Sequence, residues 1–150
     1  MYHIIINPAS RSGRGAKIWA EQVEPALKAG NTEYQTYFSG KAGEVRQLAA
    51  QITAEHAAEP DLTLIVLGGD GTINETLQGI ADPSKVILGY IPTGSGNDFA
   101  KGCQMPLDVR HAVQNILSHK YVKQLEEKQL IRTEPTDIRM ANGMKRNGNL

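Results

Sequence analysis

The chain has 150 residues, 40% hydrophobic and 21% charged, which is the length and composition of one compact domain with a buried core. Its 16 basic and 16 acidic side chains give a formal net charge of zero, which excludes the strong basic field typical of nucleic-acid-binding proteins. The single cysteine, Cys103, excludes a disulfide framework, and no apolar run approaches the roughly 18 residues of a membrane-spanning helix, so we expect a cytoplasmic protein.

Strands and helices are predicted to alternate along the first 120 residues. Short apolar, β-branched runs predict strands at 2–6, 33–38, 62–67 and 86–91. Apolar residues at helical spacing predict helices around 19–27, 45–52, 73–80 and 109–117. Pro25 should kink or shorten the first of these helices. This alternation predicts an α/β fold: a mostly parallel sheet with helices on both faces.

The pattern changes after residue 120. Residues 121–150 show no clear helix face, residues 135–140 are strand-like, and Asn142-Gly143 is a strong hairpin signal. We therefore predict an α/β domain at 1–120 and the beginning of a truncated, β-rich second domain at 121–150. A half-formed hairpin has unpaired edges, so pairing with a second copy in a homodimer stays an open alternative.

Two glycine-rich turns follow predicted strands. The run Leu64-Ile65-Val66-Leu67 leads directly into Gly68-Gly69-Asp70-Gly71-Thr72, after which a helix pattern begins. Glycine lets the backbone approach a ligand closely, and a helix N-terminus offers unpaired N–H groups to an anion such as phosphate. An ordinary βα turn is the alternative for this segment, because such turns often carry Gly and Asp.

The second turn makes that alternative less attractive. The predicted strand at 86–91 leads into Thr93-Gly94-Ser95-Gly96-Asn97-Asp98, and a short helical pattern follows. Parallel strands open at the same edge of a sheet, where ligands bind. The two turns, with the acids Asp70 and Asp98, therefore predict one shared nucleotide or polyphosphate site.

The run GGDGTINE, the later run PTGSGNDFA and the opening Asn7-Pro8 turn together resemble the catalytic domain of diacylglycerol kinases, in particular the soluble bacterial diacylglycerol and lipid kinases. The resemblance covers residues 1–120. It implies an ATP-binding domain of a lipid kinase that uses Mg²⁺ and transfers the γ-phosphoryl group to a lipid hydroxyl such as that of diacylglycerol. It also implies contact with the membrane surface, and a second domain that carries the general base, so that the 150-residue chain should be inactive alone.

The resemblance also implies a set of site residues. Asp70 is the expected acid for organising the magnesium nucleotide or the transferring phosphoryl group. The expected nucleotide contacts are Asn7, Ser10, Arg11, Thr36, Gly68, Gly69, Asp70, Gly71, Thr72, Asn74, Glu75, Ser95, Asn97 and Asp98. Alternatives stay open for several of them: Arg11 as a solvated loop arginine, Thr36 as a strand former, and Asp98 as a helix cap.

Two further functions stay open at this point. GGDGT is shared with NAD kinases, although such an enzyme is not expected to carry TGSGNDFA. A non-catalytic nucleotide-binding fragment is the second alternative. The four histidines, His3, His56, His111 and His119, show no ligand spacing, so the sequence predicts no metal site formed by histidine side chains.

Overall fold

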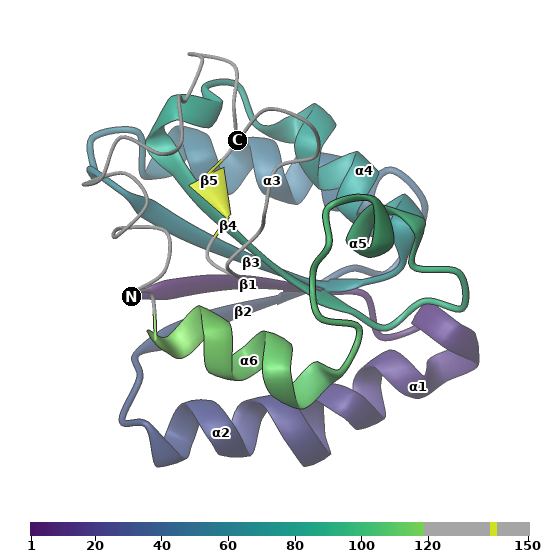
Figure 1. Ribbon diagram of the computed structural model, residues 1–150. Coiled ribbons are helices and arrows are strands. Elements are labelled where there is room, and N and C mark those ends of the chain that lie inside the picture. Colours follow the sequence, from purple (N-terminus) through teal and green to yellow (C-terminus); the bar gives the residue numbers. More distant parts are fainter. Residues whose placement is uncertain (119–138, 141–150) are drawn as a thin grey trace.

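The computed structural model of the protein describes residues 1–118 and 139–140 (Figure 1). The elements in chain order are β1 (Tyr2–Ile6), α1 (Ser10–Ile18), the π-helical turn η1 (Trp19–Val23), α2 (Glu24–Ala29), β2 (Tyr34–Phe38), α3 (Glu44–Glu55), β3 (Leu62–Gly68), α4 (Asp70–Gly79), the 3₁₀ turn η2 (Pro83–Lys85), β4 (Val86–Pro92), α5 (Asp98–Gly102), α6 (Val109–Ser118) and β5 (Arg139–Met140). None of the helices in these described residues is long and apolar enough to cross a membrane.

All strand pairs in the sheet are parallel, and the strand order is β2-β1-β3-β4-β5. From β1 the chain first moves outward to β2, and it then returns to place β3 on the other side of β1. The strand order therefore reverses between β1 and β3. In open α/β sheets a crevice for ligands forms at the carboxyl ends of the strands at such a switch point.

Helices cover both faces of the sheet (Figure 1), which confirms the predicted α/β class. The side chains of β1 alternate between the two faces, as the strand period requires. Ile5 packs with Val45, Ala49 and Ile52 of α3 on one face. On the other face, the cluster that contains Ile4 and Ile6 also contains the η1, α2 and α6 residues Trp19, Val23, Leu27, Ala112, Val113 and Ile116.

The first predicted helix is interrupted, as Pro25 suggested. The π-helical turn η1 separates α1 from α2, and Pro25, in the first turn of α2 directly after η1, cannot donate the backbone N–H that a continuing helix uses. The buried residues Trp19, Val23 and Leu27 nevertheless stay on one side and cover the sheet. The break therefore leaves the apolar face intact.

The two described residues of the C-terminal segment join the edge of the sheet. Arg139 lies opposite Ile87 and Met140 opposite Leu88, parallel to β4. The predicted hairpin at Asn142-Gly143, and most of the segment expected to begin a second domain, lie outside the described residues. The domain division at residue 120 therefore stays a prediction.

Candidate functional site

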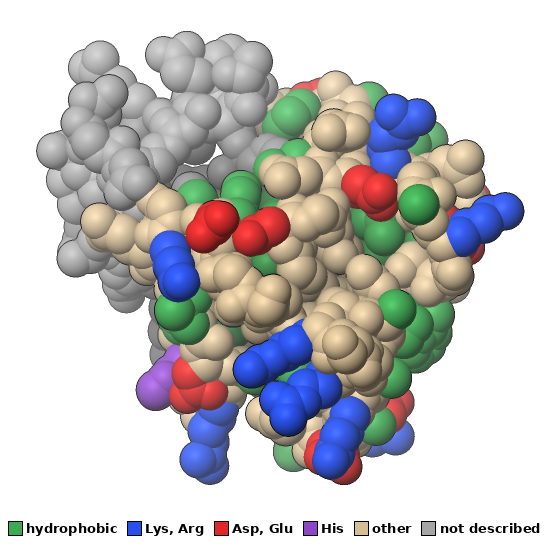
Figure 2. Space-filling model, turned by 90° about the vertical axis from the view of Figure 1, so that its right-hand side faces the viewer, with side chains coloured by type: hydrophobic (Ala, Val, Ile, Leu, Met, Phe, Trp, Pro, Cys, Tyr) green, Lys and Arg blue, Asp and Glu red, His purple; other side chains and the backbone are tan. Residues whose placement is uncertain are grey.

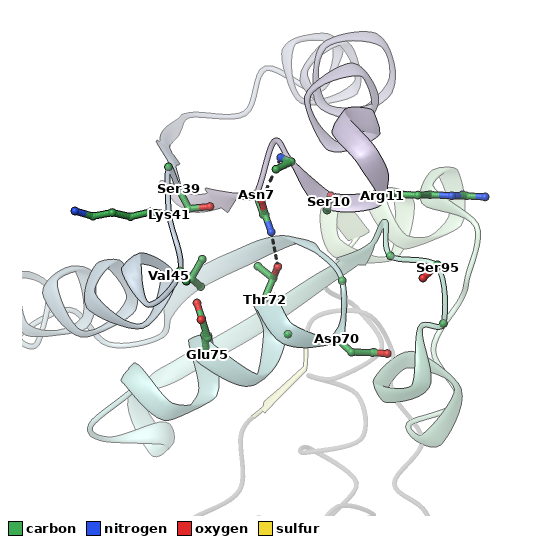
Figure 3. Close-up of a pocket in the computed structure, with 17 residues that line it drawn as sticks. Asn7, Ser10, Arg11, Ser39, Lys41, Val45, Asp70, Thr72, Glu75 and Ser95 are labelled. Atoms are coloured by element: carbon green, nitrogen blue, oxygen red, sulfur yellow. Dashed lines mark hydrogen bonds between the residues drawn. The ribbon is translucent and has the colours of Figure 1, made fainter.

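A cavity of about 560 Å³ lies at the carboxyl ends of the strands, at the point where the strand order reverses (Figure 3). Figure 2 looks onto this end of the molecule, where both basic and acidic side chains are exposed. Segments that follow β1, β2, β3 and β4 line the cavity: Asn7, Ala9, Ser10, Arg11, Ser39, Gly40, Lys41, Ala42, Val45, Gly69, Asp70, Gly71, Thr72, Glu75, Gly94, Ser95 and Gly96.

The first glycine turn joins the end of β3 directly to α4. Gly68 ends β3, and a Cβ there would lie 2.5 Å from the Thr72 side chain, so packing requires glycine. Gly71 lines the cavity in the first turn of α4, and a Cβ there would meet none of the described residues within 4 Å. Packing therefore does not explain glycine at position 71, whereas close approach of a ligand to the helix N-terminus would.

Asp70 connects the two glycine turns. Its Oδ2 accepts a hydrogen bond of 2.9 Å from the Asp98 backbone N–H, and its Oδ1 accepts one of 3.0 Å from the Phe99 N–H. The Asp70 carboxylate thus caps the N-terminus of α5, where a negative charge is also favoured by the helix dipole. Each oxygen keeps a free lone pair for a cation or a donor.

The same two turns also touch through their backbones. A Cβ at Gly94 would lie 2.7 Å from the Gly69 Cα, and a Cβ at Gly69 would lie 3.3 Å from the Gly94 Cα. The Thr93 N–H donates to the Gly68 carbonyl at 2.9 Å, next to this contact. Glycine is therefore required at position 94, and position 69 leaves little room for a side chain, where β3 and β4 end side by side.

The Asn-Pro turn after β1 is held by the Asn7 side chain (Figure 3). Its Nδ2 donates to Thr72 Oγ1 at 3.0 Å, and its Oδ1 accepts from the Ala9 N–H at 3.1 Å. A Cβ at Gly15 would lie 2.3 Å from the Asn7 carbonyl oxygen, so α1 packs closely on this turn. Asn7 therefore fixes the β1 turn to the start of α4.

A double-mutant cycle tests this link. Asn7→Ala and Thr72→Val are each expected to lower the free energy of unfolding by about 1 kcal/mol, because each removes a hydrogen-bond partner. The double variant should lose about 0.5–1 kcal/mol less than the sum of the two single losses, as measured by urea denaturation. Thr53→Val is the control partner, because Thr53 Oγ1 donates to the Ala49 carbonyl of its own helix. Strict additivity of Asn7→Ala with Thr72→Val would contradict the link.

Three buried hydroxyl groups, those of Ser10, Thr93 and Tyr90, hold the turns in place. Ser10 Oγ and Thr93 Oγ1 lie 2.7 Å apart and connect the segments after β1 and β4. The Tyr90 hydroxyl donates to the Gly68 carbonyl at 3.1 Å. Burial, with the nearby Asp70 carboxylate, raises the pKa of Tyr90, which keeps this phenol neutral as a donor. The ends of β1, β3 and β4 are therefore tied together by side chains.

Glutamates organise the loop between β2 and α3, on the far side of the cavity from the second glycine turn. Glu44 Oε2 accepts from the N–H groups of Gly40 and Lys41 at 2.8 and 3.1 Å. Glu75 Oε1 accepts from the Gly43 N–H at 3.2 Å, and Figure 3 shows its carboxylate directed toward Val45. Glu75 therefore has a structural role in addition to lining the cavity.

Two cations border the cavity, and in Figure 3 their side chains extend outward in opposite directions. Lys41 belongs to the loop after β2. Arg11 lies in the left-handed region with φ 51°, followed by Ser12 at 57° and Gly13 at 92°.

The structure brings together most of the predicted site residues. Those that line the cavity are Asn7, Ser10, Arg11, Gly69, Asp70, Gly71, Thr72, Glu75 and Ser95. Those that do not line it are Thr36, Gly68, Asn74, Asn97 and Asp98. Gly68 packs beneath Thr72, Asn74 is exposed on α4, and Asp98 begins α5. Within the described residues, Asn97 Oδ1 is buried without a hydrogen-bond partner.

Thr36 was expected to contact the nucleotide, and the structure places it away from the cavity. It lies in the middle of β2 opposite Ile4, while β2 ends at Phe38. The residues after that end, Ser39 to Ala42, line the cavity instead. The strand predicted at 33–38 ends where β2 ends, so the rule that parallel sheets bind ligands beyond their strand ends could have identified this segment from the sequence.

Comparisons with known proteins agree with this geometry. The family "Diacylglycerol kinase catalytic domain" matches residues 1–126. A diacylglycerol kinase of Staphylococcus carnosus is 38% identical over 122 residues, which cover 80% of this chain and 38% of that protein. A diacylglycerol kinase of Staphylococcus epidermidis is 35% identical over 116 residues, covering 76% and 35%.

A crystal structure of a diacylglycerol kinase from Bacillus anthracis has a TM-score of 0.61 and 27% identity, and the match covers 78% of this chain and 41% of that one. The chain thus spans less than two fifths of the curated relatives described above. It carries the matched α/β domain, with a cavity at the strand ends formed by the glycine turns. We conclude that the chain belongs to the diacylglycerol kinase catalytic domain family.

Proposed function

We propose that this domain binds Mg²⁺-ATP in the cavity at the strand ends, and that the protein to which it belongs transfers the γ-phosphoryl group to a lipid hydroxyl such as that of diacylglycerol. The observation that carries the proposal is the start of α4: its first turn opens into the cavity, with a glycine at position 71 that packing does not require. The free N–H groups and the dipole of this helix suit a phosphate chain.

The cavity has the properties that a nucleotide requires. Its volume of about 560 Å³ falls within the range of small-molecule sites. Residues of both glycine turns line it, and the cations Arg11 and Lys41 stand at its border. Phosphoryl transfer depends mainly on positioning and charge neutralisation, so this arrangement matters more than a nucleophilic side chain.

The acids of the cavity fit a Mg²⁺ ion that accompanies the nucleotide. Mg²⁺ is commonly held by one or two carboxylates together with substrate phosphates and water. Asp70 and Glu75 line the same cavity, and each carboxylate retains acceptor capacity beyond its backbone hydrogen bonds. When bound, the ion would neutralise negative charge on the phosphates. Asp70 is the residue that we assign to hold it.

The lipid acceptor is inferred from the relatives, which are named diacylglycerol kinases. Because the chain spans less than two fifths of their length, we place the general base and most of the acceptor pocket in the remainder of such a protein. The complete enzyme would act at the membrane surface, where its lipid is found. The 150-residue chain alone is expected to bind the nucleotide weakly at best and not to phosphorylate lipid.

The nucleotide site is tested by calorimetry of Mg²⁺-ATP binding to Gly71→Ala. We expect the dissociation constant to rise roughly tenfold, which corresponds to about 1.4 kcal/mol of lost binding. Stability should be unchanged or higher, since alanine is favoured over glycine in a helix. Gly102→Ala is the matched control, because its Cβ also meets none of the described residues within 4 Å and it lies outside the cavity.

Nucleotide binding and acceptor assays distinguish a lipid kinase from an NAD kinase-like enzyme and from a non-catalytic nucleotide-binding protein. Equal affinity of Gly71→Ala and Gly102→Ala would argue against phosphate binding at the α4 N-terminus. The acceptor requires a longer protein that carries this domain, assayed with diacylglycerol, a sphingoid base and NAD. Phosphorylation of NAD alone would indicate an NAD kinase-like enzyme. Nucleotide binding without transfer to any acceptor would indicate a non-catalytic nucleotide-binding protein.

A further inference from the structure

A cluster of two histidines and a glutamate lies at the end of the sheet opposite the cavity. His3 is the second residue of β1, near the amino ends of the strands. His56 is the first residue after α3, and Glu59 lies in the turn that leads to β3. The rings of His3 and His56 have centroids 4.2 Å apart, and candidate ligand atoms of all three side chains lie within 4.8 Å of one another.

The ring of His3 is held in place by a neighbouring strand. Its Nδ1 lies 3.1 Å from the hydroxyl of Tyr37 in β2, and the His3 side chain is buried. This hydrogen bond leaves Nε2 as the nitrogen that is available to a ligand. Orientation of a histidine by a hydrogen bond to its second nitrogen is the usual support of a metal ligand.

The other two groups are more accessible and form a pair. His56 Nδ1 lies 2.6 Å from Glu59 Oε1. Both side chains reach solvent, with 25% and 52% of their surface exposed, and they lie at the end of a helix and in a turn. They can therefore adjust toward the fixed ring of His3.

We propose that His3, His56 and Glu59 bind a divalent transition-metal ion, for which Zn²⁺ is the reference. Two imidazole nitrogens and one carboxylate oxygen are a ligand set that Zn²⁺ accepts, with water in the fourth position. Tetrahedral bonds of about 2.0–2.1 Å require ligand atoms about 3.4 Å apart. Rotation of the accessible His56 and Glu59 side chains, with loss of the hydrogen bond between them, would bring the three ligand atoms to this spacing.

The pKa shifts of His3 and Glu59 favour the forms of these two side chains that bind metal. Burial lowers the pKa of His3, assisted by His56 and the N-terminal ammonium group and opposed by Glu59 and Glu55. The hydrogen bond from His56 lowers the pKa of Glu59. A neutral imidazole and an ionised carboxylate are the forms that coordinate metal.

The location gives the ion a structural role. It would join the beginning of β1 to the end of α3 and to the turn before β3, at the opposite end of the strands from the cavity. An ion that binds the folded chain and not the unfolded chain raises the thermal midpoint. We therefore expect stabilisation of the domain with no effect on nucleotide binding.

The test is Zn²⁺ calorimetry on the chain with a histidine-free tag. His56→Ala and Glu59→Gln, both at accessible positions, are each expected to raise the dissociation constant by more than about tenfold. His111→Ala is the matched control. His111 also pairs with an acid three residues away, Asp108 at 3.0 Å, but no third ligand completes a cluster with it among the described residues. This control should bind Zn²⁺ as the unchanged chain does.

Two further measurements distinguish loss of the metal site from loss of the fold. Co²⁺ should give the intense visible absorption of a tetrahedral site in the unchanged chain and in His111→Ala, and lose it in both cluster variants. Zn²⁺ should raise the thermal midpoint of the same two proteins, and a chelator should reverse the shift. Equal Zn²⁺ affinity in all four proteins, or loss of binding in His111→Ala, would overturn the site.

Discussion

Asp70→Ala is expected to reduce kcat for lipid phosphorylation by a longer protein carrying this domain by about 100-fold or more, the size of effect seen when a charge-stabilising group is removed. The same change should lower the free energy of unfolding of the domain by about 1–2 kcal/mol. Asp70 accepts two backbone hydrogen bonds at the start of α5, and we propose that it also holds the ion of the nucleotide. The two losses are measured by steady-state kinetics and by urea denaturation.

Asp82→Ala is the matched control for that experiment. Asp82 also caps a short helical segment, η2, by accepting from the backbone N–H and the hydroxyl of Ser84. It lies before β4, at the opposite end of that strand from the cavity. Its removal should affect stability and leave kcat unchanged. If Asp70→Ala lost only stability and kept full activity, Asp70 would be a helix cap without a part in phosphoryl transfer.

Gly94→Ala is expected to lower the free energy of unfolding by about 1–3 kcal/mol, the usual cost of forcing an extra group into a packed site. Its Cβ would lie 2.7 Å from the Gly69 Cα, so one backbone must move away from the other. Because both residues line the cavity, the displacement should also weaken Mg²⁺-ATP binding by roughly tenfold or more. Urea denaturation and calorimetry measure the two effects.

Gly96→Ala is the control, two residues away in the same loop. It shows whether any added side chain in this turn destabilises the domain, or only one at the Gly94–Gly69 contact. Its Cβ would lie 3.6 Å from Asp70 Oδ2, which is ordinary van der Waals contact. The stability of Gly96→Ala should therefore stay within about 0.5 kcal/mol of the unchanged chain. Similar destabilisation of the two variants would show that the close contact between Gly94 and Gly69 is not the cause of the stability loss.

The order and type of the main elements follow from local patterns in the sequence. The four strands β1 to β4 start within one residue of their predicted positions, because apolar periodicity reports which side of an element is buried. The helices were predicted less exactly: the first was expected around 19–27, whereas α1 already begins at Ser10. The break near Pro25 was also local, since proline lacks the N–H that a helix interior uses. The resemblance to diacylglycerol kinases, carried by the glycine turns and the Asn-Pro turn, is confirmed by the family match.

Roles within the site depended on contacts that no local pattern encodes. Glycine at 68 and 94 is required by packing, whereas glycine at 71 is not, and all three look alike in the sequence. Thr36 was expected to contact the nucleotide, but it lies within β2, two residues before that strand ends at Phe38. Ser39 lines the cavity because β2 ends only at Phe38.

The sequence by itself determined the α/β class, the positions of the turns and the family. Periodicity, proline and glycine act over a few neighbouring residues, so a single chain segment carries that information. Only the tertiary structure decided which residues meet. Asp70 reaches the start of α5, Asn7 reaches Thr72, and His3 reaches His56 across more than fifty residues. Such contacts arise when parallel strands align in register and helices pack on them, and sequence spacing alone does not contain that arrangement.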